Sequence, residues 1–456
     1  MTTLKSTAFP ASFSREPLNA PRHLSYFAPR LPDGPLAIGF AFCCAFSALL
    51  SVSGLGPIYL LSFFGFAGLF TLVYPYASLR ANARNAAFWL FPAWMFMSAG
   101  WSSNPDRTIH SSLLVVPTFI VGMALGGIAD RRAVNVGAAV AAILYITYSV
   151  AVSSTTGFSD TGSGGTALTG LGSGKNFYGH LAAISLLLAP GLFSYAWEEY
   201  GRVAVAAGLF GIAVSIYALL GSHATGSLLA SLIGAATYPA VLLFRRIAWQ
   251  WRVVLLSATA GMLILYLSFG EELKDMVFQA VLAKFNKDTS LTGRTTLWDF
   301  ADRLIAQHRL LGYGYGSFWQ TSNPDAWTVW RMMGVAPNSG FNFHNTFRET
   351  LIDGGLIGLI IYLGTFGVAF VRTALRSLRT GELIDAVRLS FIIYFVIRMP
   401  VESTGIGGPS LDTIMLLAFL SVPLSGKASA AVSNEAEPRF RTRARQLPLR
   451  PSLQFR

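Results

Sequence analysis

The chain has 456 residues, of which 53% are hydrophobic and only 12% are charged, and its mean hydropathy is +0.51. Because soluble proteins carry about 25% charged residues, this composition excludes a soluble globular protein and indicates one that crosses a membrane several times. The net charge of +12 comes largely from arginines between apolar runs and in the C-terminal tail, and the positive-inside rule explains where they lie without nucleic-acid binding.

Long continuous apolar runs predict the fold class. They extend over roughly 18–22 residues, as transmembrane helices do, whereas the strands of a membrane β-barrel alternate over about 10 residues. We therefore predict an all-α polytopic membrane protein with about twelve transmembrane helices. The predicted spans cover residues 36–53, 57–76, 86–103, 111–128, 133–152, 177–196, 203–221, 225–244, 253–270, 346–371, 386–401 and 410–425.

These spans divide the chain into five parts. Residues 1–35 are polar and contain no cleavable signal peptide that the sequence supports, so we expect a cytoplasmic tail. Residues 36–270 hold the first nine spans, and residues 271–345 form one large polar loop. Residues 346–425 hold the last three spans. Residues 426–456 are rich in Ala, Ser, Pro and Arg and predict a disordered basic tail.

The short loops alternate between arginine-containing and nearly arginine-free. The arginine-containing set should face the cytoplasm. This orientation predicts an inner-membrane protein with both termini in the cytoplasm. The loop 271–345 then falls on the periplasmic side, and its own basic residues are no contradiction because long loops do not follow the charge rule.

Arg294 is the first candidate site residue of the large loop. It follows Gly293 and leads into Trp298–Ile305, which has the pattern of a short amphipathic helix. Glycine lets a backbone approach a ligand closely, and the planar guanidinium matches phosphate oxygens. The alternative is an arginine that only pairs with Asp299 or Asp302.

His344 is the second candidate, with Asn345 beside it, where the loop returns to the membrane ahead of Glu349. Histidine is the side chain most easily tuned as a general base near neutral pH. The alternative is a histidine that caps the following helix. Tryptophans of the same loop, Trp319, Trp327 and Trp330, could stack on sugar rings or serve as interfacial anchors.

Three further polar positions lie close to predicted spans. Lys175 and Asn176 open a helix after a Gly/Ser/Thr-rich loop and could bind an anion at the helix N-terminus. His223 lies in the turn Gly221–Gly226, which is either a hairpin that reaches the site or a plain polar turn. Arg398 and Glu402, near the end of a late span, could pair with each other or extend a polar cavity.

The sequence has no Cys/His cluster, no Ser-His-Asp set and no Asp-x-Asp pair. A metal-dependent glycosyltransferase or phosphatase usually displays a carboxylate pair. We therefore expect no metal site and no cofactor.

Several motifs together resemble the O-antigen ligase and Wzy-type polymerase superfamily, and within it the ExoQ-like exopolysaccharide production branch. The motifs are Leu-Thr-Gly-Arg-Thr-Thr-Leu-Trp (291–298), His-Arg-Leu-Leu-Gly-Tyr-Gly-Tyr-Gly-Ser-Phe-Trp (308–319), Phe-His-Asn-Thr-Phe (343–347) and Asp-Gly-Gly-Leu-Ile-Gly-Leu (353–359), with weaker matches at 101–106 and 174–176. Their order around one long loop is more specific than any one of them.

The resemblance implies a GT-C-like, metal-independent inverting glycosyltransferase that acts on an undecaprenyl-diphosphate-linked glycan. Arg294 matches the family arginine that binds the donor diphosphate, and His344 matches the histidine proposed to activate the acceptor hydroxyl. A second family arginine is missing, because its place reads Ser-His-Ala-Thr at 222–225. Lys175, His223 or Arg398 could substitute for it. The resemblance also implies a flippase and a chain-length co-polymerase as partners.

Three functions are compatible with these features. The first is a polymerase that joins lipid-linked repeat units into exopolysaccharide. The second is a ligase that moves glycan onto lipid A–core or protein. The third, from a different class, is a transporter of lipid-linked oligosaccharide, although transporters favour inverted repeats and the sequence shows no internal repeat.

Overall fold

Helices form nearly all of the structure in the described part of the chain. The computed structural model describes residues 34–52, 57–128, 130–152, 154–160, 163–172, 174–198, 200–244, 246–254, 257–258, 261, 293–405 and 407–424. In chain order the elements are α1 (Gly34–Val52), α2 (Pro57–Val73), α3 (Pro75–Arg84), η2 (Ala86–Trp89), α4 (Leu90–Met97), η3 (Ser98–Gly100), α5 (Pro105–Gly127), α6 (Arg131–Val152), β1 (Thr155–Asp160), β2 (Ser163–Leu168), α7 (Lys175–Leu188), η4 (Ala189–Tyr195), α8 (Gly201–Gly221), α9 (Thr225–Phe244), α11 (Arg294–Gln307), α12 (Pro324–Met333), α13 (Thr346–Thr380), α14 (Leu383–Arg398) and α15 (Leu411–Leu420).

The fold is that of an all-α polytopic membrane protein, with one small β-hairpin added. Among the described residues, seven helices are long and apolar enough to cross a membrane, or eight if the bent pair α2 and α3 is one span. The predicted count of twelve is therefore not confirmed. The predicted span 253–270 falls mostly outside the described residues.

The rest of the difference between the twelve predicted spans and the seven or eight candidate spans comes from helices that are bent or short. α3 turns by 99° from α2, where Pro75 removes a backbone donor and starts a new helix. The apolar helical segment Ala86–Gly100 is shorter than a span. α14 has 16 residues and carries Asp385, Arg388 and Arg398, and α15 has only 10.

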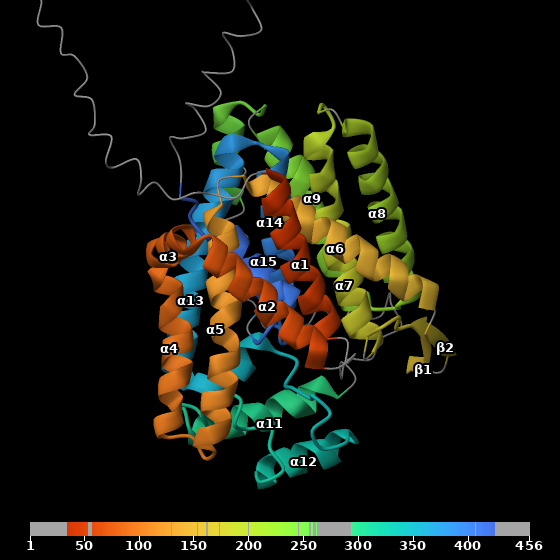
Figure 1. Ribbon diagram of the computed structural model, residues 1–456. Helices are drawn as coiled ribbons and strands as arrows, with labels where there is room; N and C mark the ends of the chain where they lie inside the picture. Colours follow the sequence, from red (N-terminus) through yellow and green to blue (C-terminus); the bar gives the residue numbers. More distant parts are fainter. Residues whose placement is uncertain are drawn as a thin grey trace, which may run out of the picture.

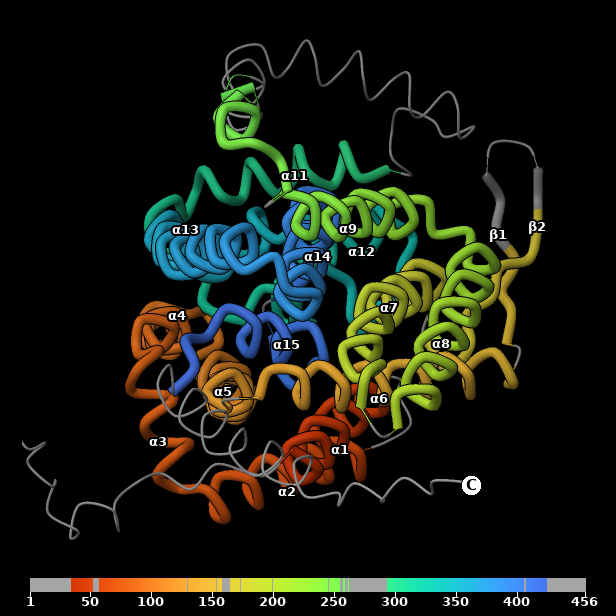
Figure 2. The backbone as a smooth tube through the Cα atoms, turned by 90° about the horizontal axis from the view of Figure 1, so that it is seen from above, coloured from red at the N-terminus to blue at the C-terminus, as the bar shows by residue number. Residues whose placement is uncertain are grey.

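Small residues let the helices of the bundle pack closely. α1 packs on α6 and α15 packs on α5 (Figures 1 and 2). A Cβ atom added at Gly137 of α6 would lie 2.4 Å from the Ile38 carbonyl oxygen, and one at Gly126 of α5 would lie 2.5 Å from the Ala418 carbonyl oxygen. Close backbone approach of this kind is typical of helices packed in membranes.

The hairpin of β1 and β2 was not predicted. The strands pair antiparallel from Thr155 opposite Leu168 to Asp160 opposite Ser163. They lie in the Gly/Ser/Thr-rich segment that precedes α7, where the sequence analysis expected a loop.

The described part of the large loop, from residue 293, forms a layer of its own at one end of the bundle, with α11 and α12 in it (Figure 1). The amphipathic helix predicted at Trp298–Ile305 lies within α11. The layer has a hydrophobic core built from Leu297, Phe318 and Trp330, among others. Trp330 is therefore part of this core and not free to stack on a sugar.

α13 is interrupted at Gly355, whose φ of 65° and ψ of −167° are not helical. The interruption frees backbone groups, and the loop satisfies them. Tyr313 N donates to Ile352 O at 2.7 Å and Gly314 N to Asp353 O at 3.1 Å, while Leu356 N donates to Arg309 O at 2.9 Å. A break in a membrane helix is tolerated when other parts of the protein satisfy the freed backbone groups in this way. The hydrogen bonds at the break thus hold residues 309–314 against the bundle.

We predict that Gly355→Ala destabilises the protein. An alanine Cβ would lie 2.2 Å from the Leu310 carbonyl oxygen, and the backbone conformation of Gly355 costs a residue with a side chain about 1–3 kcal/mol more. Thermal unfolding of the detergent-purified protein should show a lower midpoint and a lower yield of monodisperse protein. Gly364→Ala is the matched control, because no atom of the described residues lies within 4 Å of its Cβ position; equal stability of the two variants would contradict the prediction.

Candidate functional site

Three of the polar side chains singled out in the sequence lie around the carboxylate of Glu402. Arg294 Nη2 donates to Glu402 Oε1 at 2.8 Å, and His344 Nδ1 lies 2.9 Å from Glu402 Oε2. Arg398 Nη2 lies 3.8 Å from Glu402 Oε1. We call these four residues the Glu402 cluster. They come from α11, the residues before α13, the end of α14 and the turn after it.

Local backbone geometry presents Arg294 and His344 to this carboxylate. Gly293 precedes α11 with a φ of 84°, which glycine adopts without strain, and Arg294 also donates to Val401 O. His344 has a φ of 49°, and Asn342 Oδ1 accepts its backbone N–H at 2.8 Å. A strained, non-glycine position of this kind requires support from its surroundings.

Asn345 locks the start of α13 against the segment that carries Glu402. Its Oδ1 accepts the N–H groups of Phe347 and Arg348, both at 3.0 Å, as an N-cap does. Its Nδ2 donates to Pro400 O at 2.7 Å, and its backbone N donates to Ser403 Oγ at 3.2 Å. The helix is therefore capped by Asn345, which answers the alternative that His344 is the cap.

Two contacts hold α11 against the segment around His344. Trp298 Nε1 donates to Phe343 O at 2.9 Å. Arg348 forms a bidentate pair with Asp302, at 2.9 and 2.7 Å, the geometry in which an arginine–carboxylate pair is most specific. Asp302 is therefore the partner of Arg348, and Arg294 pairs with Glu402 instead of with Asp299 or Asp302.

The partner of His344 is also different from the one that the sequence pointed to. Glu349 accepts hydrogen bonds from Trp319 Nε1 and from Phe343 N, each at 2.9 Å. It thereby fixes the loop, while Glu402, distant in the sequence, bonds to His344. The pairing of Arg398 with Glu402, left open by the sequence, is present.

The positively charged groups around Glu402 determine the pKa of its carboxyl. Burial by itself raises the pKa of this carboxyl, but the hydrogen bond with His344 and the guanidinium groups of Arg294 and Arg398 together lower the pKa to about 2. Glu402 is thus an anion at neutral pH. The two arginines and this one carboxylate leave the cluster with a net charge of +1 when His344 is neutral.

A chain of buried polar contacts continues from Arg398 into the bundle. Arg398 Nη1 donates to Ser227 Oγ and to Tyr394 Oη. Tyr394 Oη lies 2.8 Å from His180 Nδ1, and His180 Nε2 lies 2.7 Å from Asp412 Oδ2. The chain holds Arg398, which is 4% exposed, in one orientation. The sequence analysis missed His180, Tyr394 and Asp412; the signal was ionisable residues within apolar runs, which are costly there unless paired.

Lys175, Asn176 and His223 lie at the ends of neighbouring elements. Lys175 and Asn176 begin α7, as predicted, and His223 lies in the tight turn between α8 and α9. A Cβ added at Gly179 would lie 2.4 Å from Ala224 Cβ, so this turn packs against the first turns of α7. α9, which starts two residues after His223, carries the Ser227 that Arg398 contacts.

Within the ranges that the structure describes, no three His, Cys, Asp or Glu side chains come together in a way that could hold a metal ion. The Glu402 cluster itself offers an imidazole oriented by a carboxylate, with guanidinium groups beside it.

Comparison with known proteins identifies a related family. Residues 210–363 match the protein family described as O-antigen ligase. About a third of the chain, including the large loop and the start of α13, is therefore similar to that family. The matched segment contains Arg294 and His344, whereas Arg398 and Glu402 lie beyond its C-terminal end.

The chain is also similar to the exopolysaccharide production protein ExoQ of Rhizobium meliloti (strain 1021). The two sequences are 26% identical over 287 residues, which is 62% of this chain and 64% of that protein. The similarity therefore spans a little less than two thirds of the length of this relative. It confirms the resemblance to the exopolysaccharide production branch.

We predict that Glu402 makes stability depend on pH. Its folded-state pKa of about 2 lies below its ordinary value of 4.5, so its ionised form stabilises the fold above pH 4.5, and this contribution is lost as the pH falls from 4.5 toward 2. The difference between the two values corresponds to roughly 3 kcal/mol. The melting temperature of Glu402→Gln should lie below that of the native protein at pH 7, and the gap should narrow below pH 4.5.

The control for this measurement is Asp299→Asn on the same loop layer, at an exposed carboxylate. That variant should keep the pH profile of the native protein. A constant gap between Glu402→Gln and the native protein from pH 7 to pH 3 would show that the cations do not stabilise the ionised carboxylate.

Proposed function

We propose that the protein polymerises undecaprenyl-diphosphate-linked oligosaccharide repeat units into exopolysaccharide by metal-independent, inverting glycosyl transfer. The observation that carries this proposal is the Glu402 cluster, in which one carboxylate orients a histidine and holds two arginines next to it. We further propose that the protein lies in the bacterial inner membrane with both termini in the cytoplasm and the large loop in the periplasm.

His344 is the proposed general base. Its Nδ1 faces Glu402, so in the neutral ring the Nδ1 hydrogen is donated to the carboxylate and Nε2 carries the lone pair. A carboxylate that orients a histidine in this way also stabilises the imidazolium that forms on proton transfer. The acceptor sugar hydroxyl gives its proton to Nε2 while its oxygen attacks the anomeric carbon of the donor. General base catalysis of this kind typically contributes 10²–10⁴-fold.

Arg294 is the proposed contact for the leaving diphosphate. As the bond between the anomeric carbon and the diphosphate oxygen breaks, negative charge grows on the diphosphate, and a preorganised cation stabilises it. Two of the N–H groups of Arg294 are used by Glu402 and Val401, and a guanidinium has five, so the others can bind phosphate oxygens. The side chain is 15% exposed.

Arg398 is the proposed substitute for the missing second arginine. With its side chain 5% exposed and bonded to Ser227 and Tyr394, it acts through its charge from behind Glu402 more than by direct contact. Lys175, Asn176 and His223, and Asn345 through its cap of α13, remain proposed contributors to substrate binding. The proposed partners are the lipid bilayer, a flippase and a chain-length co-polymerase.

A ligase is the second candidate, because the family that the chain matches is described as O-antigen ligase. A ligase would use the same base and the same cations but a different acceptor, such as lipid A–core or protein. The absence of an arginine at 222–225 favours the polymerase.

We predict that Arg294→Ala and His344→Ala each abolish polymer while the protein is still made and inserted. Loss of the cation leaves the developing diphosphate charge unstabilised, and loss of the imidazole removes the base, with a fall of at least 10²-fold expected. Polymer length and yield would be measured in cells lacking the native gene. Arg331→Ala, at an exposed position on α12, is the matched control and should be close to native. Full polymer from His344→Ala would refute the role of the base, and full polymer from Arg294→Ala that of the diphosphate contact.

The second test uses purified protein in lipid with an undecaprenyl-diphosphate-linked repeat unit, EDTA and no nucleotide sugar. We expect products separated by whole repeat units on gels and in mass spectra. Polymer that forms only after a divalent metal is added would contradict the metal-independent reaction. Product only when lipid A–core or protein is supplied would identify a ligase, and movement of unchanged substrate across liposomes would identify a transporter.

A further inference from the structure

The far half of α13 carries a groove that has no part in the Glu402 cluster. The groove has a volume of about 850 Å³ and is lined by residues between Leu363 and Thr380. All of the residues that line it belong to α13, so it is a shallow, open groove along one helix and not an enclosed pocket. Because the Glu402 cluster lies at the start of α13, the groove is at the opposite end of the same helix.

One side of this groove is apolar and exposed. Leu363, Val368, Val371 and Leu375 are 48%, 69%, 53% and 49% exposed. Gly367 lies between them, and no described atom comes within 4 Å of its Cβ position, which leaves the surface hollow there. Exposed aliphatic side chains on a helix that can cross a membrane fit the hydrocarbon chains of lipids.

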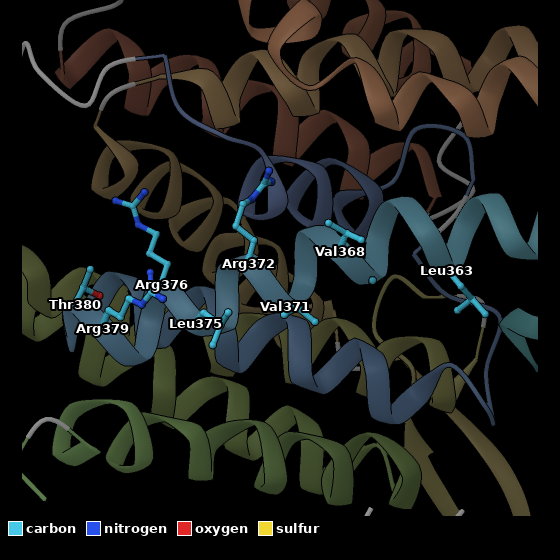
Figure 3. A pocket seen from close by; sticks show the side chains of 9 residues that line it. Leu363, Val368, Val371, Arg372, Leu375, Arg376, Arg379 and Thr380 are labelled. Carbon is cyan, nitrogen blue, oxygen red and sulfur yellow. The ribbon is translucent and has the colours of Figure 1, made fainter. Parts of the chain in front are cut away.

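The other end of the groove is strongly basic. Arg372, Arg376 and Arg379 line it. Figure 3 shows Arg376 and Arg379 at one end of the row, Arg372 nearer its middle and Leu363 at the other end. The helix after its break at Gly355 is about 37 Å long at 1.5 Å per residue, more than the hydrocarbon thickness of about 30 Å. The arginines of the last turns therefore reach the level of lipid headgroups.

The carboxylate beside these arginines does not neutralise them. Asp385 is completely buried and lies 3.0 Å from Arg131 Nη1, 3.6 Å from Arg388 Nη1 and 3.8 Å from Arg376 Nε. One anion is thus shared among three cations. Arg379 forms no ion pair or side-chain hydrogen bond with any of the described residues.

We propose that this groove binds an anionic phospholipid of the membrane, with its phosphate on Arg372, Arg376 and Arg379 and one acyl chain along Leu375, Val371 and Val368. Guanidinium groups pair well with phosphate oxygens, and basic clusters at the end of a membrane helix attract anionic lipids by about 1 kcal/mol per residue. The apolar stripe next to the charges selects a lipid over a free phosphate. This binding does not depend on the function of the Glu402 cluster.

The test measures lipid binding to the detergent-purified, delipidated full chain by native mass spectrometry. Phosphatidylglycerol and phosphatidylcholine of equal chain length are the probes. We expect phosphatidylglycerol to be retained at least fivefold better. Arg376→Gln/Arg379→Gln should lose that preference, with about a fivefold fall per arginine, and Arg379→Lys should keep most of it.

Two further variants separate the apolar and charged parts of the site. Gly367→Leu fills the hollow without changing the charge and should lower retention of phosphatidylglycerol. Arg331→Gln on α12, outside the groove, should bind as the native protein does. Unchanged preference in Arg376→Gln/Arg379→Gln would overturn the proposal. So would displacement of phosphatidylglycerol by millimolar inorganic phosphate, which would indicate a site for free phosphate.

Discussion

The backbone hydrogen bonds across the break in α13 are the constraint on which the rest of the structure depends. Tyr313 and Gly314 donate to carbonyls that the break at Gly355 leaves free, and Arg309 accepts from Leu356 beyond it. An unpaired buried backbone group is costly, so the hydrogen bonds from the loop stabilise the break in α13 and also hold the loop in place. This exchange fixes the loop layer on the bundle, and the layer in turn delivers Arg294 and His344 to Glu402.

Glu402 then converts a set of separate polar residues into one site. A buried carboxylate is costly by itself, and two arginines and a histidine around it offset that cost. The same contacts orient the histidine and hold the arginines close together without a substrate. Buried polar contacts continue from Arg398 through Tyr394 and His180 to Asp412. The Glu402 cluster is therefore held in place by the helices of the bundle as well as by the loop.

α13 connects two regions of different chemistry. At its start, Asn345 and Thr346 bind the segment that carries Glu402, where we propose glycosyl transfer. At its end, arginines exceed the carboxylates around Asp385, where we propose an anionic lipid. The stretch between them is apolar and partly exposed. On these two proposals, α13 would set the level in the bilayer at which the proposed lipid-linked substrate meets the Glu402 cluster.

The sequence by itself indicated the membrane class, the resemblance to the O-antigen ligase family, the helices on either side of the large loop, and Arg294, His344 and Arg398 as candidate site residues. Long apolar runs and short motifs are local properties, so they can be recognised in the sequence without knowledge of the fold. It did not determine the number of spans, because the bend at Pro75 and the short helix α15 depend on packing. It also assigned His344 the neighbour Glu349 instead of Glu402, and it overlooked His180. Only the tertiary structure could decide these pairings, because the partners are brought together by the docking of the loop on α13, and a buried charge takes the partner that packing places within reach.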